Sequence, residues 1–110
     1  MKQGEIWLAS LDPTIDSEQG GTRPVLIISG NAMNDNFSLV IICPITSKIK
    51  NFIGDIILEP DDENGLNEIS EVMIFQIRSF SKNRLIKKIG IVQKSSMALL
   101  IQNLNKILKY

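Results

Sequence analysis

The amino-acid sequence predicts a small, mainly β protein, in which a strongly bent antiparallel sheet or barrel carries one C-terminal α-helix. Short runs rich in β-branched residues are separated by turn-forming residues, which is typical of strands. Apolar residues near the C-terminus recur instead at three- and four-residue steps, which is typical of a helix. The segments between the runs are too short for the helical crossovers of a parallel sheet. The length of 110 residues fits one domain spanning residues 1–110.

The predicted strands are bounded by glycine, proline, asparagine and aspartate, which favour turns. Between the second and third strands, Asn31 to Asn36 predicts a hairpin loop with Asn-Asp-Asn near its tip. Ser81 to Arg84 predicts one helical turn, and Gly90 predicts a bulge or a point of close packing in the last strand. The six predicted strands are Glu5 to Ser10, Val25 to Ser29, Phe37 to Ile45, Gly54 to Glu59, Ser70 to Arg78 and Leu85 to Val92.

The C-terminal segment has the period of an amphipathic helix. Ser95 or Ser96 is expected to cap its start, and Lys106 and Lys109 suit the negative end of its dipole. The apolar stripe is expected to pack on the sheet, or to form an apolar edge at the two-fold axis of a dimer. Its members are Met97, Leu100, Ile101, Leu104, Ile107 and Leu108.

Composition excludes several kinds of site. The sequence has no histidine, which rules out a Ser-His-Asp triad, a Cys-His pair and any metal site that contains histidine. Its 12 basic and 12 acidic residues give a formal net charge of zero, which argues against a protein that coats nucleic acid nonspecifically. The single Cys43 cannot form an intramolecular disulfide and is expected to be a small buried hydrophobe. Without a signal-peptide core or an apolar run long enough to cross a membrane, the chain is expected to be cytoplasmic.

The most informative segment is Gly20-Gly21-Thr22-Arg23-Pro24, which leads directly into the apolar run from Val25. Glycine allows tight turns and the close approach of another backbone, and Pro24 biases Arg23 toward an extended conformation. Arg23 is therefore expected at a well-defined strand start beside an open loop. Its planar guanidinium can donate two parallel hydrogen bonds to a phosphate. The same pattern also fits a plain turn with a solvated arginine.

Two further segments carry groups that can bind phosphate or bases. Thr46, Ser47 and Lys48 follow a predicted buried strand, where hydroxyls and lysines can hold a phosphate. Gln76 and Arg78 share one face of the fifth predicted strand by alternation, and they can contact a base edge or a phosphate. Ordinary loop chemistry and a solvated sheet face are the competing interpretations of these segments.

The acidic loop after the fourth predicted strand does not match a calcium-binding EF-hand. Its spacing is suitable at several positions, but the first position would be Pro60, which has no side-chain oxygen. The flanking segments also have the pattern of strands rather than helices. A solvated acidic loop is expected, and no metal or cofactor is predicted.

Four segments, in matching order and spacing, resemble the MazF/PemK family of bacterial toxins, which are metal-independent endoribonucleases. The resemblance covers nearly the whole chain, and its most specific part is the segment that holds Arg23. It implies an SH3-like barrel of the MazF, CcdB and Kid kind, a symmetric homodimer, and an antitoxin whose disordered C-terminal segment binds the RNA face. The four segments are Gly4-Glu5-Ile6-Trp7, Glu18-Gln19-Gly20-Gly21-Thr22-Arg23-Pro24-Val25, Pro44-Ile45-Thr46-Ser47, and Gln76-Ile77-Arg78-Ser79 with Arg84-Leu85.

The resemblance also implies a reaction and a set of residues. Family toxins cut single-stranded RNA such as mRNA by attack of the 2′-hydroxyl, which leaves a 2′,3′-cyclic phosphate and a 5′-hydroxyl. Arg23 matches the family's catalytic arginine, and Thr46 matches its catalytic threonine. Some relatives carry an acid at the position of Phe75, which cannot take a proton, so Glu18 is the candidate carboxylate base. The expected RNA contacts are Gln19, Ser47, Lys48, Gln76, Arg78 and Arg84.

Two alternatives stay open. A gyrase-poisoning toxin like CcdB has the same barrel and dimer, but it acts through its C-terminal residues, which the ending Ile107-Leu108-Lys109-Tyr110 does not resemble. A nucleic-acid-binding barrel without catalysis would bind RNA and leave it intact.

Overall fold

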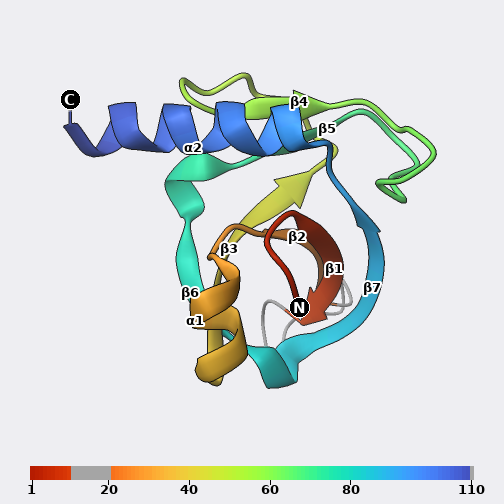
Figure 1. The fold of residues 1–110 in the computed structure, drawn as a ribbon. Coiled ribbons are helices and arrows are strands. Elements are labelled where there is room, and N and C mark those ends of the chain that lie inside the picture. The colour runs from red at the N-terminus through yellow and green to blue at the C-terminus, as the bar shows by residue number, and fades with distance from the viewer. Residues whose placement is uncertain (11–20, 110) are drawn as a thin grey trace.

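A computed structural model of the chain describes residues 1–10 and 21–109. An antiparallel sheet curls round on itself, and the C-terminal helix lies across one end of it (Figure 1). The prediction of a mainly β fold with a C-terminal helix is confirmed. The strands and α-helices are β1 (Glu5–Ser10), β2 (Thr22–Ile27), α1 (Asn31–Asn36), β3 (Leu39–Thr46), β4 (Ile56–Leu58), β5 (Ser70–Val72), β6 (Arg78–Ser81), β7 (Leu85–Ile91) and α2 (Lys94–Lys109); the 3₁₀ turns are η1 (Ile74–Gln76) and η2 (Lys82–Arg84).

Strand β3 pairs with three other strands of the sheet, β2, β5 and β6. The strand order is β4-β5-β3-β2-β1-β7, and β6 pairs with β3 on the same edge as β5. Every pair is antiparallel. Within the described residues no ladder joins β4 to β7, so the sheet is strongly curled rather than fully hydrogen-bonded into a closed barrel.

The alternation of β3 divides its side chains between two apolar clusters. Val40 and Ile42 pack in a cluster with Phe80 of β6, and all three are buried. Cys43 and Ile45 pack in the other cluster, which includes the buried residues of α2. Because successive residues of a strand point to opposite faces, this division follows directly from the period of two.

The fifth predicted strand, Ser70 to Arg78, is wrong as a continuous strand. If the pairing of Ile45 with Val72 continued along β3, residue 75 would lie opposite Ile42. Arg78 lies there instead, so the chain contains three extra residues between β5 and β6. The turn η1 accommodates this insertion between β5 and β6. The prediction that Gln76 and Arg78 share a strand face is therefore also wrong, because Gln76 lies in the turn.

The predicted hairpin loop over Asn31 to Asn36 is wrong, since this segment is the helix α1. Asn34 is 2% exposed, and its Nδ2 donates a hydrogen bond to the carbonyl of Ser29 at 2.9 Å. Asn36 Nδ2 donates to the carbonyl of Ala32 at 2.7 Å. These side-chain bonds offset the usual preference of asparagine for turns.

Helix α2 covers the sheet with part of its apolar stripe. Met97 and Leu100 are buried, but Ile101 is 39% exposed and Leu108 is 74% exposed. The predicted serine cap is wrong, because the helix begins at Lys94 and the N–H groups of Ser96 and Met97 donate to the carbonyl of Gln93. No helix among the described residues is long and apolar enough to cross a membrane.

The prediction of close packing at Gly90 is confirmed. A Cβ atom there would lie 2.3 Å from both the carbonyl carbon and the oxygen of Asn64, whose loop crosses β7 at this point. The pairing of β1 with β7 also shifts beside Gly90, between Ile6 and Trp7. The position therefore requires glycine because a neighbouring backbone occupies the space of a side chain.

We expect Gly90→Ala to lower the free energy of unfolding by about 1–3 kcal/mol, as overpacking does. Gly30→Ala is the control, because a Cβ atom at Gly30 would meet nothing within 4 Å. That substitution should change stability by less than about 0.5 kcal/mol. Urea unfolding of both variants measures the difference, and equal midpoints would contradict the packing account.

Candidate nucleic-acid interface

Arg23 and Thr46 come from neighbouring strands and meet at one cavity. β2 pairs with β3 through Val25 opposite Pro44, and continuing this register by two residues puts Arg23 opposite Thr46. Residues directly opposite each other in an antiparallel pair project on the same face. Both side chains line a cavity of about 310 Å³, called here the Arg23–Thr46 cavity.

The Arg23–Thr46 cavity is cationic. Lys48 and Lys50 line it together with Arg23, and none of its described lining residues is acidic. Gln76 adds a side-chain amide, while Pro44, Phe52 and Met73 form apolar parts of the wall. A net charge of zero over the whole chain thus coexists with a local concentration of positive charge. Such a cavity suits a phosphate group.

Thr46 is held firmly at the end of β3. It is 8% exposed, and its backbone lies opposite Glu71 of β5. Its Oγ1 accepts a hydrogen bond from the N–H of Lys48 at 3.1 Å. A hydroxyl that accepts one bond still has its own proton to donate. The geometry therefore allows Thr46 to donate to a ligand oxygen in the cavity.

The structure brings together five of the residues predicted from sequence. Arg23, Thr46, Lys48 and Gln76 line the Arg23–Thr46 cavity. Ser47 lines an adjoining cavity of about 580 Å³, which shares Arg23, Thr46 and Lys48 with the first. The two cavities therefore adjoin at these three shared residues, and the second also has an acidic lining residue, Glu68.

Four predicted residues are not placed in this group. Arg78 and Arg84 line neither cavity, and their guanidinium carbons lie 5.4 and 4.5 Å from the ring centroid of Phe80. Arg84 Nε also donates to the carbonyl of Ser10 at 2.8 Å. Glu18 and Gln19 lie outside the described residues.

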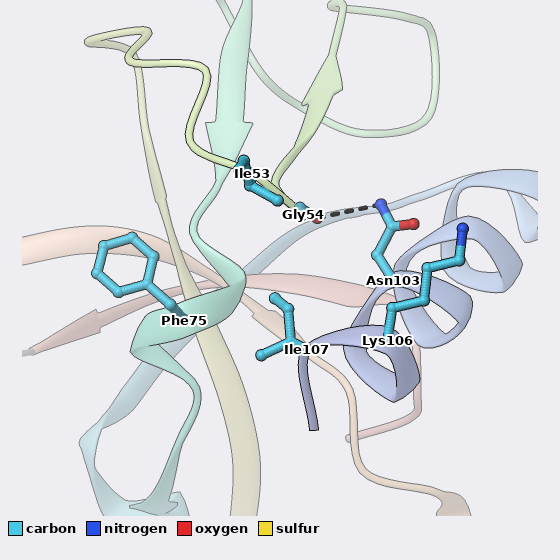
Figure 2. A pocket seen from close by; sticks show the side chains of 6 residues that line it. All are labelled: Ile53, Gly54, Phe75, Asn103, Lys106 and Ile107. Atoms are coloured by element: carbon cyan, nitrogen blue, oxygen red, sulfur yellow. Dashed lines mark hydrogen bonds between the residues drawn. The ribbon is translucent and has the colours of Figure 1, made fainter. Parts of the chain in front are cut away.

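Phe75 belongs to a different surface from its chain neighbour Gln76. It is 51% exposed, and its ring meets Phe52 edge-on with centroids 5.3 Å apart. Figure 2 shows Phe75 on η1 across a second hollow from Asn103 and Lys106 of α2. This hollow, of about 650 Å³, is mainly apolar. Phe75 therefore does not line the Arg23–Thr46 cavity.

Cys43 has no chemical role in this cavity. The side chain is fully buried, as predicted. Burial, and to a smaller extent the nearby Asp55 carboxylate, raises the pKa of its thiol to about 12. A thiol that stays protonated is a poor nucleophile.

Sequence reasoning missed a pair of acids near the Arg23–Thr46 cavity, the half-buried Asp55 and the fully buried Glu71. Burial and the neighbouring Glu71 carboxylate raise the pKa of Asp55 to about 7. A hydrogen bond from Asp55, together with backbone amides, lowers the pKa of Glu71 to about 2. Both directions favour a proton on Asp55 rather than on Glu71. The available signal was a charged residue within the short apolar run around Val72.

Comparisons with known proteins identify the class of the chain. A family model described as PemK-like, MazF-like toxin of type II toxin-antitoxin system matches residues 2–108. The chain therefore belongs to the PemK/MazF family of toxins.

Individual relatives agree with this family. The endoribonuclease MazF of Staphylococcus saprophyticus is 36% identical over 88% of this chain and 82% of its own length. The endoribonuclease EndoA of Bacillus subtilis is also 36% identical, over 81% of this chain and 78% of its own. Among solved structures, a MazE–MazF structure from Deinococcus radiodurans has a TM-score of 0.82 at 25% identity, covering 99% of this chain and 96% of that one.

The Asp55–Glu71 pair predicts that stability falls as pH rises from 3.8, the ordinary pKa of an aspartate, to about 7. In this window the native protein keeps a proton on Asp55 that the unfolded chain releases, so rising pH favours unfolding. Glu71 has the opposite effect, but only between pH 4.5 and about 2. Cys43 faces the pair without titrating in this window, and the sequence has no histidine.

Asp55→Asn should therefore flatten the dependence of Tm on pH between about pH 4 and about pH 7. Asp62→Asn is the matched control, since Asp62 is exposed in the acidic loop. It should keep the slope of the wild-type protein. A wild-type slope retained in Asp55→Asn would show that Asp55 is not the proton carrier.

Proposed function

We propose that this protein is a toxin of a type II toxin-antitoxin system that cleaves single-stranded RNA at specific sequences without a metal ion. The observation that carries the proposal is the meeting of Arg23 and Thr46 in one cationic cavity. Family membership and relatives named endoribonucleases support the same activity. Positively charged hydrogen-bond donors line the cavity, and they can directly stabilise the charge on the phosphoryl oxygens of RNA.

The proposed reaction is an intramolecular displacement within the RNA. The 2′-oxygen attacks the adjacent phosphorus, the bond from phosphorus to the 5′-oxygen breaks, and the products are a 2′,3′-cyclic phosphate and a 5′-hydroxyl. Arg23 stabilises the negative charge that grows on the phosphoryl oxygens. Thr46 donates a hydrogen bond to the same phosphate, and Lys48 adds positive charge.

Two protons must also move in this reaction. The 2′-hydroxyl gives one proton to a base, and the 5′-oxygen takes one from an acid. An arginine guanidinium holds its proton tightly and is a poor proton donor, so charge stabilisation is the main role of Arg23, with proton transfer secondary. Glu18 is the proposed carboxylate base. Gln19, Ser47, Gln76, Arg78 and Arg84 are proposed RNA contacts.

The proposed partners are a second copy of the chain and a cognate antitoxin. A solved relative is a MazE–MazF structure, which supports an antitoxin partner. The antitoxin would bind through a disordered acidic segment that folds along the cationic surface and blocks RNA. The exposed Ile101 and Leu108 of α2 suit an apolar contact between copies. The proposed place of action is the cytoplasm, where mRNA is the target.

Arg23→Ala should lower kcat for cleavage by about 100-fold or more, because a donor to the transition state is lost. Thr46→Val, which keeps the shape and removes the hydroxyl, should lower it in the same direction. Glu18→Gln should do so as well if Glu18 is the base. The measurement is cleavage of a long single-stranded RNA in excess chelator, with mapping of the cyclic phosphate ends.

Lys109→Ala, at the far end of α2, is the control and should cleave like the wild type. Wild-type rates in Arg23→Ala would overturn the catalytic assignment. The same assay separates the alternatives. RNA binding without cleavage would indicate a barrel that has no catalytic activity. Inhibition of gyrase without RNA binding or cleavage would indicate a CcdB-like poison.

The antitoxin is expected to compete with RNA. A saturating amount of cognate antitoxin should displace a labelled RNA in which the attacking 2′-hydroxyl is replaced by hydrogen, because both need the same cationic groups. Fluorescence anisotropy of the label measures the displacement. A stable complex of toxin, antitoxin and RNA would contradict a shared surface.

A further inference from the structure

Glu71 is a buried, charged residue, and its hydrogen-bond partners indicate its structural role. It lies in β5 between β3 and β4, opposite Thr46 and Ile57, and it is 0% exposed. It does not line the Arg23–Thr46 cavity. Burying a carboxylate costs several kcal/mol unless hydrogen bonds compensate. The donors that satisfy Glu71 therefore identify the part of the structure that depends on it.

Those donors are three consecutive backbone amides. Glu71 Oε1 accepts from the N–H groups of Lys50 at 2.6 Å and Asn51 at 2.8 Å, and Oε2 accepts from Phe52 at 3.2 Å. Residues 47–55 form no strand or helix, and Asn51 has a left-handed φ of 55°. Successive amides that converge on an anion form a nest, and here the anion is the protein's own carboxylate. The conformation of residues 50–52 thus depends on Glu71.

The same segment forms one wall of the cationic cavity. Lys48, Lys50 and Phe52 all line the Arg23–Thr46 cavity. The segment is attached at its start by the bond from Lys48 N–H to Thr46 Oγ1, and further along by Glu71. Two of the three cations in the cavity therefore stand on backbone that Thr46 and Glu71 fix.

Asp55 attaches the opposite wall to the same point. Its Oδ1 accepts from the N–H of Ile74 at 2.8 Å, and Ile74 begins η1, which ends at Gln76 in the cavity. Its Oδ2 is buried and has no hydrogen-bond partner among the described residues. Burial and the neighbouring Glu71 raise the pKa of Asp55 to about 7, so below that pH the two carboxyl groups do not carry two negative charges side by side.

We infer that Glu71 is a positioning residue for RNA binding, which sets where Lys48 and Lys50 meet a phosphate by holding the amides of residues 50–52. This inference rests on the proposed function. The lysines contact the phosphate before and during the reaction, so the loss of their alignment weakens substrate binding and transition-state binding alike. Such a loss raises KM and leaves kcat nearly unchanged.

The first test is Glu71→Gln, which keeps the shape of the side chain but replaces one acceptor oxygen with a donor. KM for an RNA oligonucleotide that the wild type cleaves should rise about tenfold. Its kcat should stay within about threefold. Destabilisation alone gives the opposite pattern, because a smaller folded fraction lowers the apparent kcat and leaves KM unchanged. Met97→Ala, a buried change in α2, is the control that should show this second pattern.

A double-mutant cycle tests whether Glu71 acts through the lysines. Lys48→Ala with Lys50→Ala should raise KM, and adding Glu71→Gln should raise it no further. Effects that multiply, or an unchanged KM in Glu71→Gln, would overturn the inference. If Glu71→Gln does not fold, the variant that combines Lys48→Ala with Lys50→Ala decides the question. An unchanged KM in that variant would overturn the inference, because the lysines that Glu71 is inferred to position would not contribute to RNA binding. If the wild type cuts no RNA, the proposed function fails, and Kd for the bound RNA replaces KM in every comparison.

Discussion

The pairing register of β3 is the constraint on which the rest of the structure depends. This strand pairs with β2 on one edge and with β5 and β6 on the other. Its alternating residues fill two separate apolar clusters. A slip by one residue would move every side chain of the strand to the opposite face. The burial of Val40, Ile42 and Cys43 thus fixes the register. Thr46 stands opposite Arg23 because the core leaves no other alignment.

The sequence predicted the features that depend on local patterns. The period of two located most strands, and the longer period located α2 through residues such as Leu100 and Leu104. The segment around Arg23 and the turn after β3 were recognisable from their residue types and order. The errors arose where tertiary contacts override local preference. Asn34 stabilises a helix through Ser29, and the three-residue insertion at η1 is visible only against β3.

The hydrogen-bond partners of the acid pair could not be predicted, for a related reason. Glu71 lies 21 residues from Lys50, and the bond joins a carboxylate to a backbone amide, which every residue except proline carries. Spacing therefore contains no sign of it. Net charge likewise gives no sign of the local concentration of positive charge, because Lys48 and Lys50 are far from Arg23 along a chain whose total charge is zero. The fold collects these cations around one cavity, none of whose described lining residues is acidic, so net charge says little about the local surface.

A half-buried acid whose pKa is raised to about 7 near a cationic cavity would ordinarily suggest a general base. Geometry argues against that role for Asp55. It lines neither the Arg23–Thr46 cavity nor the adjoining one, and its Oδ1 is occupied by the N–H of Ile74. Glu71 is no better, because three amides occupy its carboxylate and its pKa of about 2 makes it a weak base. A base must reach the proton that it removes, whereas a positioning group needs only to hold the backbone. Asp55 and Glu71 therefore act on the shape of the cavity, because they hold the backbone N–H groups of Ile74 and of residues 50–52.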